Sequence, residues 1–324
     1  MESIHAGPYV FEIFRSFERI FQLLKKNKIV HNKVMKIIIM SLLTATLISS
    51  TAFSCFHFPK NYVGALTEGR KEIVLFHDGK NAHMVIRTTL TSNKFPKEIA
   101  WVLPFPSLPS KYEEIDGPFF EELNRILPDN NLGEGSFGEG RVALYKSSGI
   151  KVHDAVVLGH YVIQPIEILK EGSGKELNAW LQKNKFTGMP YDNQKYYLRK
   201  GAAFLAIRMK MNRPASNTIT SKPLHIVYVA DKLTAPIKFT HDKRTFSLDL
   251  YIFSKKELKK DLTEQYLKPE PSARYKNEGN YPFVDSLIGQ MDGYLTRYKA
   301  DSLNTEGRSL MKLKEDPSFL VSEL

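Results

Sequence analysis

Three His-Asp dipeptides carry the side chains of this sequence that could do chemistry: His77-Asp78, His153-Asp154 and His241-Asp242. An imidazole oriented by a carboxylate is the base of many hydrolases, and a zinc site needs three or four such groups within about 2.0 to 2.3 Å of the ion. The sequence contains no H-E-x-x-H motif. Two of the three pairs fall at expected turns or strand ends, where Asp accepts backbone hydrogen bonds. We therefore interpret them as structural and assign no catalytic, cofactor-binding or metal-binding residue.

Two further histidines and both tryptophans are also interpreted as structural. His83 and His225 lie inside expected strands, where we expect them to be partly buried and hydrogen-bonded. Trp101 and Trp180 could line a ligand groove, but aromatic side chains within a strand and a helix more often belong to the core. The sequence thus offers a hydrolase only scattered His and Asp residues.

The stretch "LGEGSFGEGRVALYK", residues 132–146, has glycines at the G-x-G-x-x-G spacing of the loop that covers ATP in protein kinases. It follows the expected end of a helix, whereas the kinase loop joins two strands. Phosphoryl transfer also requires a catalytic Asp and a metal-binding Asp, yet no H-R-D, D-F-G or A-P-E motif follows. We expect no ATP site here and interpret residues 129–141 as a mobile surface linker.

A signal-like segment occupies residues 35–54: Met-Lys, then "IIIMSLLTATLISS", then a small-residue region before Cys55. The apolar run of residues 37–53 is short for a permanent membrane span. We expect it to be a signal peptide. Residues 1–34 are then an extension from a start codon assigned too early. The alternative for them is a basic amphipathic helix on a membrane, since Phe14, Phe17 and Phe21 recur at helical spacing before several lysines.

Cys55 is the only cysteine, so it cannot form an intrachain disulfide. It directly follows the expected cleavage region, and "AFSC" is a loose version of the sequence after which bacterial lipoproteins are cleaved and acylated. We expect Cys55 to be lipidated and residues 55–70 to be a tether. The alternative is ordinary cleavage that leaves a free or intermolecularly paired thiol. The expected location is the cell envelope, either lipid-anchored at a membrane or in the periplasm.

The formal net charge of the 324 residues is +11. Residues 1–36 hold seven basic and three acidic residues, so that seven of the eleven charges remain from Cys55 onward. These charges are scattered, whereas a nucleic-acid binder concentrates them in a stripe or a recognisable module. We therefore expect no nucleic-acid partner.

Alternation of apolar residues predicts an α+β domain over residues 71–268, with a mixed or antiparallel β-sheet flanked by several helices. Strands are expected in segments such as "EIVLFHDGKNAHMVIRTTLT", "EIAWVLPFP", "HYVIQPIEIL", "AAFLAIRMKM", "PLHIVYVA" and "TFSLDLYIFS". Helices are expected after Pro118, after a capping box at Ser173, within "NQKYYLRKG" and after a second capping box at Ser254. Residues 269–324 are expected to be mostly polar, with a short helix around residues 283–298.

Over residues 69–319 the chain resembles the bacterial "domain of unknown function 2330" family. The resemblance rests on "EIAWVLPFPSLP", "VVLGHYVIQPIEIL…LNAWLQKN", "KGAAFLAIRMKM" and "PLHIVYVADKLTAPIKF", in the order expected of that family. It implies an exported bacterial protein with no established activity. Members often carry two closely spaced cysteines after the signal. Here Phe58 stands where the second would be, so any role of such a pair is absent.

The function expected from these observations is that of a non-enzymatic binding or structural protein of the bacterial cell envelope. Its partner or ligand is unknown, no cofactor is expected, and contact with the membrane would run through the lipid. The alternative is a hydrolase of envelope material that uses His and Asp residues. A structure in which a His or Asp pair converges at a pocket would favour the enzyme.

Overall fold

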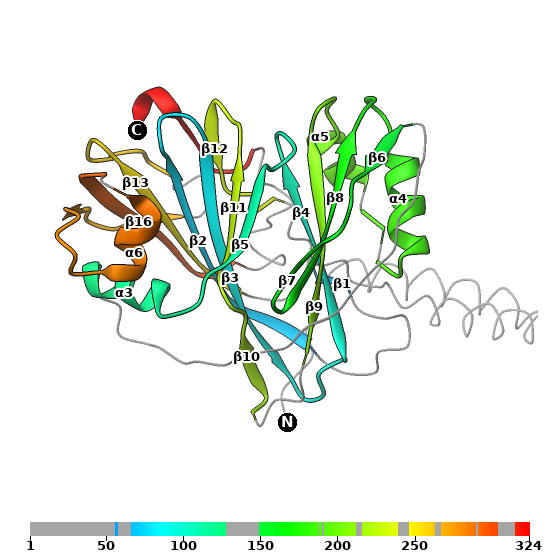
Figure 1. Ribbon diagram of the computed structural model, residues 1–324, viewed down its shortest axis with the longest axis horizontal. Coiled ribbons are helices and arrows are strands. Elements are labelled where there is room, and N and C mark those ends of the chain that lie inside the picture. The colour runs from blue at the N-terminus through cyan, green and yellow to red at the C-terminus, as the bar shows by residue number, and fades with distance from the viewer. Residues whose placement is uncertain are drawn as a thin grey trace, which may run out of the picture. The chain divides into compact units, whose positions relative to one another are not determined.

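The computed structural model describes residues 56–57, 66–127, 149–186, 188–189, 191–211, 216–238, 246–262, 267–289, 291–303 and 315–324 (Figure 1). The chain divides into two units, Met1–Thr51 and Ala52–Leu324, and all of the described residues lie in the second. Two large sheets, a separate pair of strands, four α-helices and a short 3-10 helix make up this part of the chain. The predicted α+β class is therefore confirmed.

The larger sheet has seven strands in one continuous order, with two short strands attached beside it. The parallel pairing of β2 with β13 makes it a mixed sheet, and its other described pairs are antiparallel. The order is β14 (Lys268–Pro269), β16 (Gly293–Leu303), β13 (Phe246–Ser254), β2 (Leu66–His77), β3 (Ala82–Ser92), β11 (Leu224–Tyr228) and β5 (Lys111–Glu114), with β10 (Thr218–Thr220) on β3 and β15 (Ala273–Tyr275) on β16.

The smaller sheet is antiparallel throughout its described pairs. Its order is β1 (Phe56–His57), β4 (Glu98–Phe105), β9 (Ala203–Lys210), β8 (Tyr161–Ile168) and β6 (Ile150–Val152), and β7 (Val156–Leu158) also pairs with β8. A separate pair is formed by β12 (Lys232–Thr234) and β17 (Ser318–Leu320), which precedes the 3-10 turn η3 (Val321–Glu323).

One continuous core cluster contains residues from both sheets. Alternate residues of β13, from Phe246 to Ile252, belong to it, as the sequence pattern predicts. Helix α4 (Gly174–Lys183) adds Trp180 to the same cluster. Figure 1 shows α4 and α5 (Tyr191–Tyr197) beside the smaller sheet. Trp101 is fully buried and Trp180 nearly so, which confirms their interpretation as core residues.

A second apolar cluster joins the larger sheet to helices α3 (Phe119–Ile126) and α6 (Pro282–Ile288), which lie beside each other in Figure 1. Glu122 links the two helices, because its Oε2 accepts hydrogen bonds of 2.9 Å from the backbone N–H groups of Phe283 and Val284. A carboxylate stabilises the unpaired N–H groups at a helix start. The predicted helix after Pro118 is confirmed.

The predicted helix after Ser254 is wrong for the residues that the structure describes. Ser254 is the last residue of β13, and its Oγ donates a hydrogen bond to the carbonyl of Lys256. Leu262 then forms an isolated bridge with Leu267. The helix expected over residues 283–298 ends at Ile288, and Tyr298 lies in β16. Pairing of β16 with β13 overrides local helix preference in this segment.

Helix α4 forms where it was expected, but without the predicted capping box. Ser173 makes no side-chain bond to the helix start, and its Oγ donates to the carbonyl of Lys170 instead. Leu66 is buried and begins β2, so that residues 66–70, which were assigned to the tether, form part of the larger sheet. In the same way, β16 brings the polar C-terminal segment into that sheet.

Residues 1–54, Cys55 and the glycine-rich linker at 129–141 lie outside the described residues. Among the helices of the described part of the chain, none has the length and hydropathy needed to cross a membrane.

Candidate functional site

Strand β5, at one edge of the larger sheet, carries two consecutive glutamates with different partners. Glu113 pairs in register with His225 of β11, and Glu114 pairs with Leu224. Because successive side chains of a strand point to opposite faces, the two carboxylates reach different surroundings. Glu113 lies near the ring of His225, whereas Glu114 reaches His160 of the smaller sheet's β7–β8 turn. Two polar clusters therefore meet at β5.

The first of these, which we call the sheet-joining cluster, consists of Glu114, Asp116, His160 and Lys222. Glu114 Oε2 accepts the backbone N–H of His160 at 2.9 Å, and its Oε1 lies 3.0 Å from His160 Nδ1. Lys222 Nζ lies 3.1 Å from Glu114 and 2.5 Å from Asp116. The bond to Asp116, followed by that to Glu114, raises the pKa of Lys222. The cluster ties an edge strand of the larger sheet to a turn of the smaller one.

Gly159 allows this close approach of the turn to Glu114. Its φ is +44°, a left-handed conformation that residues other than glycine rarely adopt. A Cβ at this position would lie 2.5 Å from Glu114 Oε2 and 2.7 Å from Glu114 Cδ. Gly159 therefore permits the contact between Glu114 and the turn in two ways: it adopts the left-handed backbone conformation, and it leaves space for the carboxylate.

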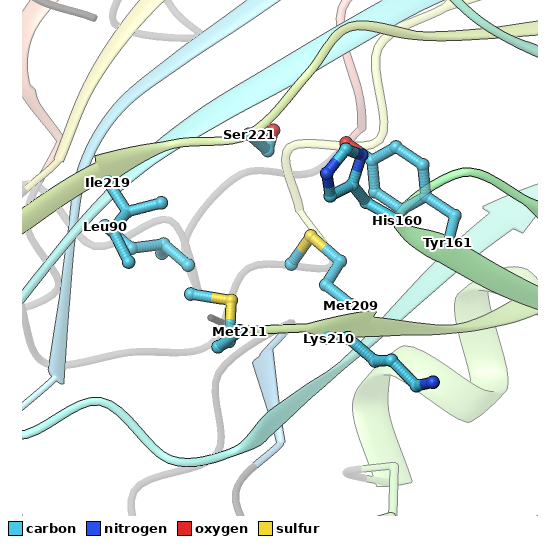
Figure 2. Close-up of a pocket in the computed structure, with 8 residues that line it drawn as sticks. All are labelled: Leu90, His160, Tyr161, Met209, Lys210, Met211, Ile219 and Ser221. Carbon is cyan, nitrogen blue, oxygen red and sulfur yellow. The ribbon is translucent and has the colours of Figure 1, made fainter. Parts of the chain in front are cut away.

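A small pocket adjoins the sheet-joining cluster where the two sheets meet (Figure 2). In Figure 2 the ring of His160 and the side chains of Met209 and Met211 border the hollow, while the amine of Lys210 points away from it. The space open to the centre of a water molecule is about 10 Å³, which is room for about one water molecule. Its lining residues are Leu90, His160, Tyr161, Met209, Lys210, Met211, Ile219 and Ser221.

The polar residues of the pocket could in principle transfer a proton or attack a carbonyl group. His160 is oriented by a carboxylate, and Ser221 and Tyr161 line the same hollow. However, Ser221 Oγ accepts the backbone N–H of Thr88 at 3.0 Å, and the Tyr161 hydroxyl donates to the carbonyl of Lys222. Burial raises the pKa of Tyr161. With room for about one water, this conformation admits no substrate side chain or sugar ring.

The second cluster, which we call the imidazole chain, consists of Asp78, His83, His225 and Glu113. His83 Nε2 lies 3.0 Å from Asp78 Oδ2, and His83 Nδ1 lies 3.0 Å from His225 Nε2. His225 Nδ1 lies 3.5 Å from Glu113 Oε2. The two rings are stacked with their centroids 5.2 Å apart, and Phe76 stacks on His83 at 4.3 Å.

Burial dominates the proton affinity of these imidazoles. His225 is only 3% exposed, and burial, together with the charge on His83, lowers its pKa to about 4. Burial also lowers the pKa of His83. For Asp78 desolvation acts in the opposite direction, but hydrogen bonds from the backbone of Asn81 and Lys80 and the contact with His83 hold its pKa below the usual range. At neutral pH both rings are uncharged.

Of the three His-Asp dipeptides, His77-Asp78 and His153-Asp154 lie in the described residues, and His241-Asp242 lies outside them. Asp78 Oδ1 accepts the backbone N–H groups of Lys80 at 2.7 Å and Asn81 at 2.6 Å, which confirms its role in the turn. His153 pairs with Glu167 at 3.0 Å in the smaller sheet, away from Asp78 in the larger. Within the described residues, no group of three or more His, Cys, Asp or Glu side chains could hold a metal ion.

The prediction that His83 and His225 are partly buried and hydrogen-bonded is confirmed, but the bond between the two rings could not be predicted from the sequence. The contributions of Glu113, Glu114 and His160 to polar clusters were not predicted. The stretch "KYEE" is too polar to stand out as a strand. The one available signal was Gly159 between two expected strands, which marks a tight turn but not its partner.

Two solved structures of a baculovirus protein are similar to this chain. The crystal structure of baculovirus P35 has a TM-score of 0.40 and 8% sequence identity, and the match covers 80% of this chain and 99% of that one. A mutated baculovirus P35 after caspase cleavage has a TM-score of 0.38 and 10% identity, with 78% and 99% covered.

No curated protein matches the sequence. The sequence model of a family described as "Uncharacterized protein conserved in bacteria (DUF2330)" matches residues 50–284, which is most of the chain. The protein therefore belongs to this family of uncharacterised bacterial proteins.

Proposed function

We propose that this protein is an exported, non-enzymatic binding or structural protein of the bacterial cell envelope, anchored to a membrane by a lipid on Cys55. The bacterial family and the signal-like segment of residues 35–54 support the location. The partner that it binds is a component of the envelope.

The observation that carries the non-enzymatic part of the proposal is the use of the sheet-joining cluster. Both oxygens of Glu114 and the backbone of His160 hold two sheets together. A catalytic base must instead reach a substrate directly or through one water. The adjoining hollow of about 10 Å³ leaves room for a water and not for a substrate.

Lipidation of Cys55 is supported by its place in the chain. It is the only cysteine, and the signal-like segment ends directly before it. Each buried CH₂ of an acyl chain contributes about 0.8 kcal/mol, and several chains give a durable anchor where one does not. The described strand β1 begins at the next residue and pairs with β4, so the anchor would be attached close to the smaller sheet.

Two measurements test the proposal separately. The full chain is produced in a bacterial host with a fatty-acid analogue, and wild type is compared with Cys55→Ala for labelling and for partition into detergent. Export is read from digestion by protease added to spheroplasts. Labelled wild type, unlabelled Cys55→Ala and protease access support the proposal. Unlabelled wild type contradicts the anchor, and a chain protected inside spheroplasts contradicts export.

A hydrolase is the second candidate, because one specific observation favours it. His160 is oriented by Glu114 in the manner of a catalytic base and lines the same pocket as Ser221 and Tyr161. For this arrangement to act on a substrate, the two sheets would have to separate at the pocket. Reaction of Ser221 with a serine-directed probe distinguishes the two candidates.

A further inference from the structure

The imidazole chain connects two exposed carboxylates through two buried rings. At one end the Asp78 side chain is 39% exposed, and at the other that of Glu113 is 48% exposed. Between them the side chains of His83 and His225 are only 12% and 4% exposed. The imidazole chain therefore runs across strands β3 and β11 of the larger sheet, from the β2–β3 turn to the edge strand β5, and its two rings are largely shielded from solvent.

The hydrogen bonds define where protons lie when both rings are neutral. The carboxylate of Asp78 accepts, so His83 donates from Nε2 and its Nδ1 must accept. His225 then donates from Nε2 to His83 Nδ1, and its own Nδ1 keeps a lone pair. This atom is buried and has no hydrogen-bond partner among the described residues. It is the nitrogen that the next proton would occupy.

Some of the groups that face the two rings stabilise a proton on His225, and others oppose it. Asp78 and Glu113 attract a positive charge, whereas Lys111 and His77 oppose it. Glu113 is also already bonded to Lys111 Nζ at 2.7 Å. Phe76, stacked on His83, contributes no charge and keeps water away. A proton on His225 would therefore stand in a buried position where its partner Glu113 is 3.5 Å away and shared with a lysine.

We propose that the His83–His225 pair is a pH-responsive joint that loosens edge strand β5 from β11 when the pair takes up a proton in mildly acidic surroundings. Strand β5 has four residues, and among the described strands of the larger sheet it pairs with β11 alone. Separation of β5 from β11 breaks four residue pairs, whereas separation of β11 from β3 would break five, so opening at β5 is the less costly way to expose His225 to water. Glu114 follows Glu113 directly in β5, so separation of this strand from β11 would also disturb the contact of Glu114 with His160.

This pH response of the His83–His225 pair goes beyond the proposed function, since it needs neither export nor lipidation. The size of the effect follows from the two states of His225. An exposed imidazole binds a proton near pH 6.5, whereas the closed state does so near 4. Between pH 7 and pH 5 the open population of β5 should therefore rise by up to about twentyfold.

Hydrogen exchange of the β5 and β11 amides tests the proposal, after correction for the intrinsic rates at pH 7 and pH 5. The wild type is compared with His225→Gln, whose amide can still donate to His83 but cannot be protonated. His153→Gln is the matched control, because His153 also pairs with a glutamate, Glu167 at 3.0 Å, in the other sheet. We expect protection to fall about tenfold to twentyfold in wild type and in the control, and by less than about threefold in His225→Gln.

Equal loss of protection in wild type and His225→Gln would overturn the proposal, as would unchanged protection in wild type. If His225→Gln does not fold, titration of the imidazole nitrogens by NMR in wild type decides. A ring of His225 that titrates near its ordinary value of about 6.5 contradicts the joint. A ring that stays neutral to below about pH 5 while the protection of the β5 amides falls over the same pH range supports it, and one that stays neutral with unchanged protection contradicts it.

Discussion

Glu114 and His160, 46 residues apart in the chain, join the two large sheets through one carboxylate that binds both the backbone N–H and the Nδ1 of the histidine. Both side chains are about nine-tenths buried. A hydrogen bond to a charged group contributes about 1.5 to 3 kcal/mol to stability when its partner is well placed. The joint is therefore a large part of what fixes the β7–β8 turn against β5.

Replacement of Gly159 by alanine should disturb this joint. The added Cβ would lie 2.5 Å from Glu114 Oε2, so we expect Gly159→Ala to reduce the free energy of unfolding by about 2 to 4 kcal/mol. The control is Gly172→Ala, at a glycine with φ of +80° and nothing within 4 Å of an added Cβ. This control should lose only about 1 to 2 kcal/mol through backbone strain. Urea unfolding measures both, and equal losses would show that Glu114 does not constrain position 159.

The carboxyl group of Asp316 should make stability depend on pH. Asp316 holds the C-terminal segment by accepting the Tyr197 hydroxyl at 2.6 Å and the Lys238 backbone N–H at 2.7 Å. Burial raises its pKa to about 7, and these hydrogen bonds only partly oppose the shift. The folded state thus holds a proton that the unfolded state loses above about pH 4, so stability falls as the pH rises from 4 to 7.

Denaturation of wild type and Asp316→Asn at pH 5 and pH 8 measures this dependence. We expect the stability of wild type relative to Asp316→Asn to fall by about 2 to 4 kcal/mol between the two pH values. Glu315→Gln, at the exposed neighbouring carboxylate, serves as the control and should show the wild-type dependence. A difference between wild type and Asp316→Asn that stays constant with pH would mean that Asp316 is ionised throughout.

Much of the β structure could be predicted, because apolar and polar residues alternate along some of its strands and other strands are continuously apolar. Strands such as β8, β9 and β13 bury nearly all of their residues, and both tryptophans follow the same logic. Strand β16 could not be predicted, since its place is set by pairing with β13 about 50 residues earlier. Polar strand β5 depends likewise on β11, more than 100 residues later.

The two polar clusters could not be predicted from the sequence either, because their members come from distant segments of the chain. His160 meets Glu114, and His83 meets His225 142 residues later, only once the sheets have formed. Of the described His-Asp dipeptides, Asp78 holds its own turn through Oδ1 and contacts His83 through Oδ2, and His153 pairs with Glu167. Spacing along the chain therefore identified residues of suitable chemistry but not their partners.

The pocket serine should be unreactive toward a fluorophosphonate probe. Ser221 Oγ accepts the backbone N–H of Thr88, and the hollow beside it has room for about one water. We expect labelling of the wild type to equal that of Ser221→Ala over hours, as read by intact-protein mass spectrometry. A single adduct that disappears in Ser221→Ala would favour the hydrolase, provided that the variant keeps the wild-type unfolding transition.

A double-mutant cycle between Glu114 and His160 tests most directly whether the sheet-joining cluster is a structural joint. The free energies of unfolding of wild type, Glu114→Gln, His160→Gln and the double variant are measured in urea at pH 7. We expect a coupling energy of about 1 to 3 kcal/mol, because each single variant leaves a buried partner incompletely bonded. Losses that add to within about 0.5 kcal/mol would contradict a structural role of the sheet-joining cluster, because they would show that the two residues do not stabilise the fold together.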